Sequence, residues 1–430
     1  MTLVDLAHPD MDALVALARS AGMLGIDTEF ISEGRYRALL CLVQVAVPDP
    51  DADGGTRVML IDPLASRDEP APAPLVALLA DPGVQVVIHA GRQDVAILRR
   101  VWGAQVSNLF DTQIAAGFAG FGAQTGYGTL LADVLGVHLS KSAGFTRWDL
   151  RPLTGEQVGY AVDDVAHLLD LAEALQRRLR SAGRLEWVAQ ECGRVEQASD
   201  ERDPDSAWER LPRVHQLSGR ARAVAQALAA WRERTAAAED RPLGSVLADQ
   251  TLLEIARRQP ADTAGLERIR GLQPSTLRRR GGDLLTVVQQ GLRARPPAPR
   301  EHDRLDLRPG DIPLIALAEA LIRSRAATAG LAYELVASRN DLEQVITSVR
   351  RRDPEPDVRT LQGWRRELVG AELLDLLAGR RLLGVDRNGQ LVVHDTAADG
   401  DASAPPAGSA AGDVQRVGAG RPVDHEPDLD

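Results

Sequence analysis

The chain has 430 residues, 44% of them hydrophobic and 26% charged, which is the balance of a folded protein with about two to four domains. The net charge of −11 excludes a protein whose whole surface is basic enough to attract nucleic acid, and the sequence has no apolar run long enough for a membrane helix. Its two cysteines are too few for a disulfide framework and favour a reducing compartment.

The first 200 residues predict an α/β domain in which a mixed sheet is flanked by helices. Three apolar runs with hairpin-length connections favour an antiparallel start to the sheet. Asp10 and Gly22 are suited to begin and end the first helix, and Thr154 with Gln157 forms a capping box for the last. Strands are expected at 23–30, 39–47, 57–62, 84–89 and 108–112. Helices are expected at 11–22, 74–80, 92–103, 113–118, 130–135 and 154–182.

The remaining chain predicts helices without strands. Polar or proline-rich linkers at 201–206 and 295–300 separate a helical domain over 211–295 from a second over 308–390. An acidic tail poor in large apolar residues, 395–430, is expected to be disordered. The helices are expected at 219–238, 243–258, 263–271, 276–294, 312–330, 342–350 and 363–378.

The first helical domain is basic although the whole chain is acidic. Residues 211–295 hold 15 arginines and 8 acidic residues, a net charge of +7. Such a surface can neutralise RNA phosphates, although arginine also replaces lysine throughout this chain. The candidate phosphate contacts are Arg220, Arg222, Arg232, Arg234, Arg278, Arg279 and Arg280.

Two carboxylates near the end of the 23–30 strand are the first sign of a site. Asp27 and Glu29 are two residues apart, so both point to one face of the strand. Asp94 lies in the first turn of the helix that follows the 84–89 strand. Tyr160 and Asp164 are four apart and share a helix face. Each feature has an ordinary structural explanation, and only their combination is specific.

Four carboxylates predict a metal centre. Hard oxygen ligands suit Mg²⁺ or Mn²⁺, and four acids are balanced by two ions about 3.5–4 Å apart. Such a pair is suited to hydrolysing phosphodiesters. In this arrangement Tyr160 would orient the attacking water.

Three motifs in these places resemble a known superfamily. DTEF, IHAGRQD and YAVDD are similar to the motifs of DEDD exonucleases, and Tyr160 marks the DEDDy branch. The stretches DTQIAAGFAGFG and RWDLRPLTGEQVGYAVDDV resemble the ribonuclease D family, which implies a ribonuclease H-like exonuclease domain over 1–200.

The resemblance also implies a role for each residue of the site. Asp27 would bridge both ions, Glu29 and Asp164 would bind the ion beside the nucleophile, and Asp94 would serve the other ion through water. Thr28 and Phe30 would lie beside the terminal nucleotide. Lys141 lies in a loop that either touches substrate or is an ordinary surface loop. His89 and Gln93 are near the site without a catalytic assignment.

The helical half resembles a second family. The stretch 217–272, with AWRERTA and LADQTLLEIARRQP, is similar to an HRDC domain, and 360–383 resembles a divergent second copy. This implies one or two small all-α modules that bind nucleic acid.

These features predict a metal-dependent 3′–5′ exoribonuclease. We expect a cytoplasmic monomer that trims structured RNA, tRNA precursors above all, releases nucleoside 5′-monophosphates and has no membrane partner. RNA preference rests on the resemblance alone. The alternatives are a DEDDy exonuclease acting on DNA 3′ ends and a non-catalytic nucleic-acid-binding protein. The complete set of acids with Tyr160 argues against the latter.

Overall fold

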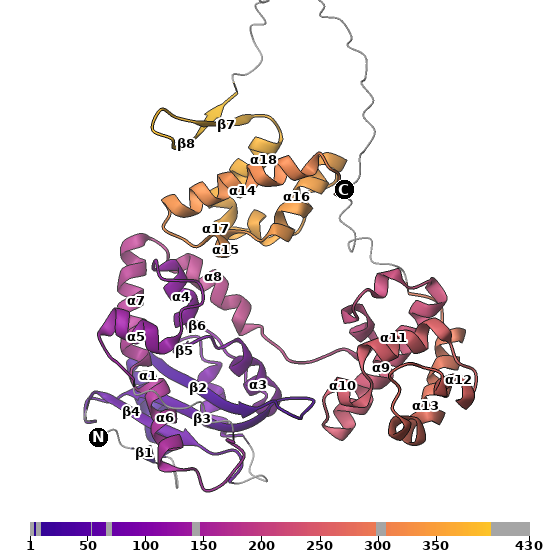
Figure 1. The fold of residues 1–430 in the computed structure, drawn as a ribbon. Helices are drawn as coiled ribbons and strands as arrows, with labels where there is room; N and C mark the ends of the chain where they lie inside the picture. The colour runs from indigo at the N-terminus through magenta and orange to yellow at the C-terminus, as the bar shows by residue number, and fades with distance from the viewer. Residues whose placement is uncertain are drawn as a thin grey trace, which may run out of the picture.

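An α/β domain comes first in the chain, and two helical domains follow it (Figure 1). The computed structural model describes residues 4–5, 10–52, 54–65, 71–139, 147–297 and 307–396. Lys141 and the predicted tail beyond Thr396 therefore lie outside the described residues. Within the described ranges, no helix has both the length and the apolar character needed to cross a bilayer.

The N-terminal domain is built on a six-stranded mixed sheet with strand order β1-β4-β3-β2-β5-β6. The predicted antiparallel start is confirmed, because β2 pairs with β3 and β3 with β4 in that sense. Strands β5 and β6 continue the sheet parallel to β2, and β1 joins the far edge parallel to β4. The strands are β1 (Val4–Asp5), β2 (Met23–Ile31), β3 (Leu39–Pro48), β4 (Thr56–Ile61), β5 (Gln85–Ile88) and β6 (Leu109–Asp111).

In the described part of this domain, eight helices flank the sheet. The predicted helix caps are confirmed. Asp10 caps the first helix and Gly22 ends it, and Thr154 with Gln157 forms the predicted capping box. The helices are α1 (Met11–Ala21), α2 (Ala73–Leu79), α3 (Arg92–Trp102), α4 (Thr112–Phe118), α5 (Tyr127–Leu135), α6 (Gly155–Ala166), α7 (Leu168–Ala182) and α8 (Leu185–Glu196).

The single long helix predicted over 154–182 is wrong. His167 leaves the helical conformation and separates α6 from α7. The break allows Leu168 and Leu169 to pack over Gly25 of β2, where a Cβ would lie only 3.3 Å from Leu168 Cδ2. No glycine or proline marks the break, so contact with the sheet decides it.

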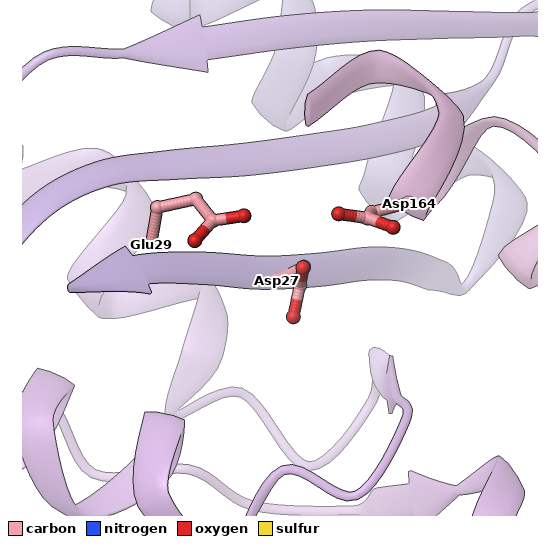
Figure 2. A group of neighbouring side chains, drawn as sticks. All are labelled: Asp27, Glu29 and Asp164. Atoms are coloured by element: carbon pink, nitrogen blue, oxygen red, sulfur yellow. The ribbon is translucent and has the colours of Figure 1, made fainter. Parts of the chain in front are cut away.

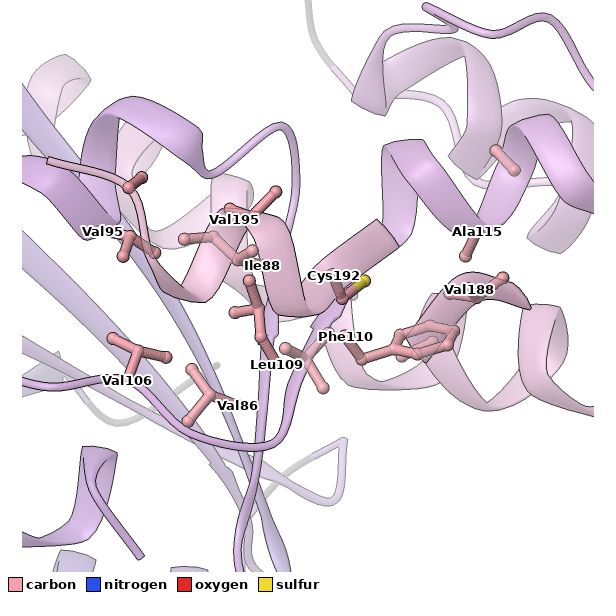
Figure 3. Close-up of a cluster of buried hydrophobic side chains, with 14 of the residues drawn as sticks. Val86, Ile88, Val95, Val106, Leu109, Phe110, Ala115, Val188, Cys192 and Val195 are labelled. Carbon is pink, nitrogen blue, oxygen red and sulfur yellow. The ribbon is translucent and has the colours of Figure 1, made fainter. Parts of the chain in front are cut away.

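Helix α8 was not predicted and covers the β5–β6 edge of the sheet. Figure 3 shows Val188, Cys192 and Val195 packed around β5 and β6. The Cys192 thiol accepts a hydrogen bond from the Asp111 amide, and burial raises its pKa to about 12. Both cysteines are buried and unpaired, which agrees with the prediction of no disulfide framework.

The first helical domain has a core of its own. Its buried residues, including Trp208, Leu228 and Leu252, form a cluster separate from the core of the N-terminal domain. Its helices are α9 (Gly219–Glu239), α10 (Leu243–Val246), α11 (Asp249–Arg258), α12 (Thr263–Glu267) and α13 (Pro274–Arg293), preceded by two short 3₁₀ turns at Pro204–Arg210 and Val214–Gln216.

The second helical domain shares the core of the N-terminal domain, because one apolar cluster runs through both. The prediction that the chain has no strands after the first domain is wrong, because residues 381–395 form a β-hairpin. The hairpin ends at Asp395, where the tail was expected to begin. The elements are α14 (Asp311–Thr328), α15 (Tyr333–Val336), α16 (Arg339–Arg351), a 3₁₀ turn (Arg359–Leu361), α17 (Gly363–Arg365), a π turn (Arg366–Gly370), α18 (Ala371–Leu377), β7 (Arg381–Val385) and β8 (Leu391–Asp395).

Candidate active site

Strand β2 and helix α6 bring three predicted carboxylates together. Asp27 and Glu29 project from one face of β2, and Asp164 points toward them from α6 (Figure 2). Each offers an oxygen, and these oxygens all lie within 4.8 Å of one another. The group has the chemistry and spacing to hold a divalent cation.

Asp94 lies beside this group and has a partner of its own. Thr28 lies between Asp27 and Glu29 on β2. Its hydroxyl donates a hydrogen bond to the Asp94 carboxylate in the first turn of α3. Thr28, expected beside the nucleotide, therefore also fixes the fourth acid.

The acids line a hollow of about 320 Å³. The lining contains every predicted site residue except Lys141. It also contains His89, Tyr127 and Leu168, which had no assigned role. The lining residues are Asp27, Thr28, Glu29, Phe30, His89, Asp94, Tyr127, Tyr160, Asp164 and Leu168.

Crowding and burial hold these acids toward the protonated form. Burial, then the charges of Asp94, Asp164 and Glu29, raise the pKa of Asp27 well above its usual range. Burial and the charges of Asp164 and Asp94 raise the pKa of Glu29 to about 8. Burial raises the pKa of Asp164 to about 7 and that of Asp94 to about 6. A bound cation would favour the ionised acids and relieve this repulsion.

Tyr160 is held at the edge of the same group. Its hydroxyl hydrogen-bonds the Asp164 carboxylate, as their spacing of four on α6 allows. Its ring lies 6.1 Å from that of the buried Trp148, with the planes tilted by 45°. Burial and the nearby carboxylates raise the pKa of Tyr160, so the hydroxyl stays protonated near neutral pH.

Three further polar residues stand close to the acids. Gln44 is fully buried directly across from Asp27 in the β2–β3 register, and within the described residues neither amide atom has a partner. A glutamine within the apolar run LLCLVQVAV was the available sequence signal. Tyr127 and His89 line the hollow with ring centroids 5.5 Å apart, and His89 Nδ1 lies 2.9 Å from the Thr112 hydroxyl.

The expected phosphate contacts divide into two groups. Arg222, Arg232 and Arg280 are buried, so the prediction that they face RNA is wrong. Arg232 and Arg280 pair with Asp249 and Glu239 inside the first helical domain, and Arg222 donates to a backbone carbonyl. The remaining four are exposed and are Arg220, Arg234, Arg278 and Arg279.

Known proteins match both halves of this architecture. A family model described as 3′–5′ exonuclease matches residues 7–180, and an HRDC domain model matches residues 221–288. Ribonuclease D of Gluconacetobacter diazotrophicus is 39% identical over 380 residues, which cover 88% of this chain and 93% of that protein. Ribonuclease D of Granulibacter bethesdensis is 38% identical over 384 residues, with coverage of 88% and 93%.

A solved structure agrees with this match. The Escherichia coli RNase D structure, titled an exoribonuclease involved in structured RNA processing, has a TM-score of 0.77 at 29% identity. The match covers 88% of this chain and 99% of that one.

The mixed sheet, the acidic hollow and the matching family model define a 3′–5′ exonuclease, a class that depends on divalent metal ions. The chain belongs to the ribonuclease D family of 3′–5′ exoribonucleases, which act in RNA processing. The predicted fold class and exoribonuclease function are thereby confirmed.

Proposed function

We propose that two divalent ions, Mg²⁺ or Mn²⁺, bind at Asp27, Glu29, Asp94 and Asp164 and serve the hydrolysis of RNA from its 3′ end. The observation that carries this proposal is the group of three carboxylates with oxygens within 4.8 Å of one another. Carboxylate oxygens are the ligands these ions prefer. Bound ions would supply a water of lowered pKa and positive charge beside the phosphate.

The protein's own groups would orient the reactants. By the family resemblance, Asp27 would serve both ions, Glu29 and Asp164 would hold the ion beside the attacking water, and Asp94 would serve the other ion. The Tyr160 hydroxyl, anchored on Asp164, would hold the attacking water in line. Water then gives up a proton and adds its oxygen to the phosphorus of the last phosphodiester, the bond to the preceding 3′ oxygen breaks and that oxygen takes up a proton, and a nucleoside 5′-monophosphate leaves. The shortened RNA keeps a 3′-hydroxyl and is ready for another cycle.

We propose structured RNA as the substrate, with tRNA precursors foremost. Phe30 and Thr28 flank Glu29 in the hollow and would lie beside the terminal nucleotide. Lys141 is a further proposed contact. Arg278 and Arg279, exposed near the beginning of α13, are suited to bind phosphates farther along the chain.

We further propose that the enzyme acts as a monomer in the cytoplasm. Two buried, unpaired cysteines are compatible with a reducing compartment.

A side-by-side assay tests the RNA assignment. The purified full chain with Mg²⁺ would receive a 3′-extended tRNA precursor, a single-stranded RNA and a single-stranded DNA of the same sequence, each labelled at its 5′ end. We expect stepwise shortening and monophosphate release from both RNAs, with the DNA at least about tenfold slower, a difference of about 1.4 kcal/mol. Equal rates on RNA and DNA would contradict the RNA assignment and favour the alternative of an exonuclease acting on DNA.

An Asp27→Asn variant tests the metal centre in the same assay. Loss of several kcal/mol of charge stabilisation predicts a rate about a thousandfold lower. Asp170→Asn, an exposed acid in the first turn of α7, is the matched control and should retain the wild-type rate. Wild-type activity in Asp27→Asn would contradict the proposed centre.

A further inference from the structure

The turn after the acidic strand contacts the first helical domain. Residues 32–38 join β2, which carries Asp27 and Glu29, to β3, and the turn reaches toward α9 and α10 (Figure 1). The Tyr36 hydroxyl donates to Glu233 Oε2 at 2.6 Å, and the Tyr36 amide donates to Asp240 Oδ1 at 3.1 Å. Seven residues beyond Glu29, the chain is therefore tied to the C-terminal half of α9.

Charged groups reinforce this contact. Arg35 Nη2 lies 2.6 Å from Asp240 Oδ2, and the guanidinium of Arg202, from the linker, lies 5.5 Å from the centre of the Tyr36 ring. Burial and the hydrogen bond to Glu233 raise the pKa of Tyr36 to about 12, so its hydroxyl remains a donor at physiological pH. We call Arg35, Tyr36, Glu233 and Asp240 the joint.

Glu233 anchors the joint inside the first helical domain. Its residue is only 1% exposed, and its second oxygen accepts a hydrogen bond from Arg210 at 3.0 Å. A carboxylate buried this deeply depends on its partners, so it holds a fixed position within α9. Because α9 forms part of the core of its domain, the joint fixes the position of that whole domain relative to β2.

The joint is polar, unlike the attachment of the second helical domain. Beside Glu233 lies a hollow of about 350 Å³ whose lining includes Arg202, Arg210 and Arg232. The second helical domain is instead attached through stacked aromatic rings and a continuous apolar core. A few polar contacts beside such a hollow separate at a lower free-energy cost than a buried apolar surface does.

We propose that Tyr36 is a positioning residue that holds the first helical domain beside the active site, so that RNA bound on this domain presents its 3′ end to the acidic hollow. The proposal rests on the proposed function, in which that domain binds RNA. Opening the joint should impair use of long structured RNA. In this proposal a short oligonucleotide uses the N-terminal domain alone, so its cleavage should be unchanged.

The test is a double variant of the full chain, Tyr36→Phe with Asp240→Asn. Both changes nearly preserve shape, and asparagine tolerates the left-handed conformation of Asp240, whose φ is 47°. Cysteines introduced at the exposed Glu156 and Gln250 would carry a fluorescent pair that reports the distance between the two domains. The native cysteines are buried and should remain unlabelled.

We expect lower energy transfer, together with about tenfold lower kcat/KM on a 3′-extended tRNA precursor. The kcat/KM on a short single-stranded RNA should stay within about twofold, because only binding of the longer RNA uses the joint. Arg177→Ala, which removes an exposed ion pair with Glu173, is the control and should change neither readout.

Unchanged energy transfer with unchanged use of the precursor would overturn the proposal. An equal loss of kcat/KM on the precursor and on the short RNA would also overturn it, because that result would place the effect in the active site. An opened joint with full activity on the precursor would overturn the positioning role as well. Failure of the proposed exoribonuclease function is distinguishable, since the wild type would then release no monophosphate from either RNA.

Discussion

The indole of Trp364 stacks on that of Trp187, with ring centroids 5.1 Å apart and the planes 19° apart. Phe118 packs its edge against Trp364 at 5.0 Å. Next to these rings, the buried Arg365 pairs with Glu191 at 2.6 Å, and Glu191 also accepts from the Trp364 indole nitrogen. The second helical domain is therefore a continuation of the N-terminal core.

This interface predicts that the two domains unfold together. Trp364→Ala should lower the free energy of unfolding of that unit by about 3–5 kcal/mol, because a large buried side chain is lost. Calorimetry should show two transitions, with only one of them shifted. Trp208→Ala is the matched control and should lower the transition of the first helical domain instead. If Trp364→Ala shifted both transitions, the first helical domain would not unfold as a separate unit, and the prediction would be contradicted.

The Thr28–Asp94 hydrogen bond predicts a change in metal dependence. Thr28→Val keeps the side-chain shape but removes the hydroxyl that fixes Asp94. We expect the Mg²⁺ concentration for half-maximal activity to rise about 10- to 100-fold, as when other ligand-orienting partners are lost. Thr28→Ser retains the hydroxyl and should remain near wild type. An unchanged Mg²⁺ titration of Thr28→Val would contradict this role.

Tyr160 should affect the chemical step more than binding. Tyr160→Phe keeps the ring beside Trp148 and loses the hydroxyl that bonds Asp164. Steady-state kinetics should show kcat lower by about a hundredfold with little change in KM. Tyr333→Phe, in the second helical domain, is the control and should match wild type. A rise in KM at unchanged kcat would instead indicate a binding role.

The raised pKa values predict how pH and metal affect stability. Burial and neighbouring acids raise the pKa of Glu29 to about 8 and those of Asp164 and Asp94 to about 7 and 6. The folded state then holds protons that the unfolded state releases. The free energy of unfolding of metal-free protein should therefore fall as pH rises from about 4 to 8.

Mg²⁺ should reverse this trend because it binds the ionised acids. At a hundred times its Kd it should stabilise the protein by about 2.7 kcal/mol, and by more at pH 8 than at pH 5. Urea unfolding with EDTA or Mg²⁺ at both pH values measures this difference. Glu29→Gln should flatten the dependence. Metal-free stability that rises with pH would contradict the expectation.

Local rules were sufficient for the parts of the site that lie close together in the chain. Alternation along β2 placed Asp27 and Glu29 on one face, and the spacing of four on α6 placed Tyr160 beside Asp164. Asp94 lies in the first turn of α3, as the sequence indicated. Strand periodicity and capping residues likewise located most of the sheet and its helices, because both depend on neighbouring residues.

Tertiary contacts decided the rest. The hydrogen bond from Thr28 to Asp94 joins residues 66 apart, and that from Tyr36 to Glu233 joins residues 197 apart. Packing of Leu168 over Gly25 ends α6 without a helix-breaking residue. Periodicity and charge predicted a divalent-metal site suited to phosphodiester hydrolysis and a basic first helical domain, and the motif resemblance implied a 3′–5′ exonuclease. Long-range contacts decide which arginines are buried and which helical domain shares the core of the N-terminal domain. No local sequence pattern records these contacts, because their free energy arises only when distant segments meet.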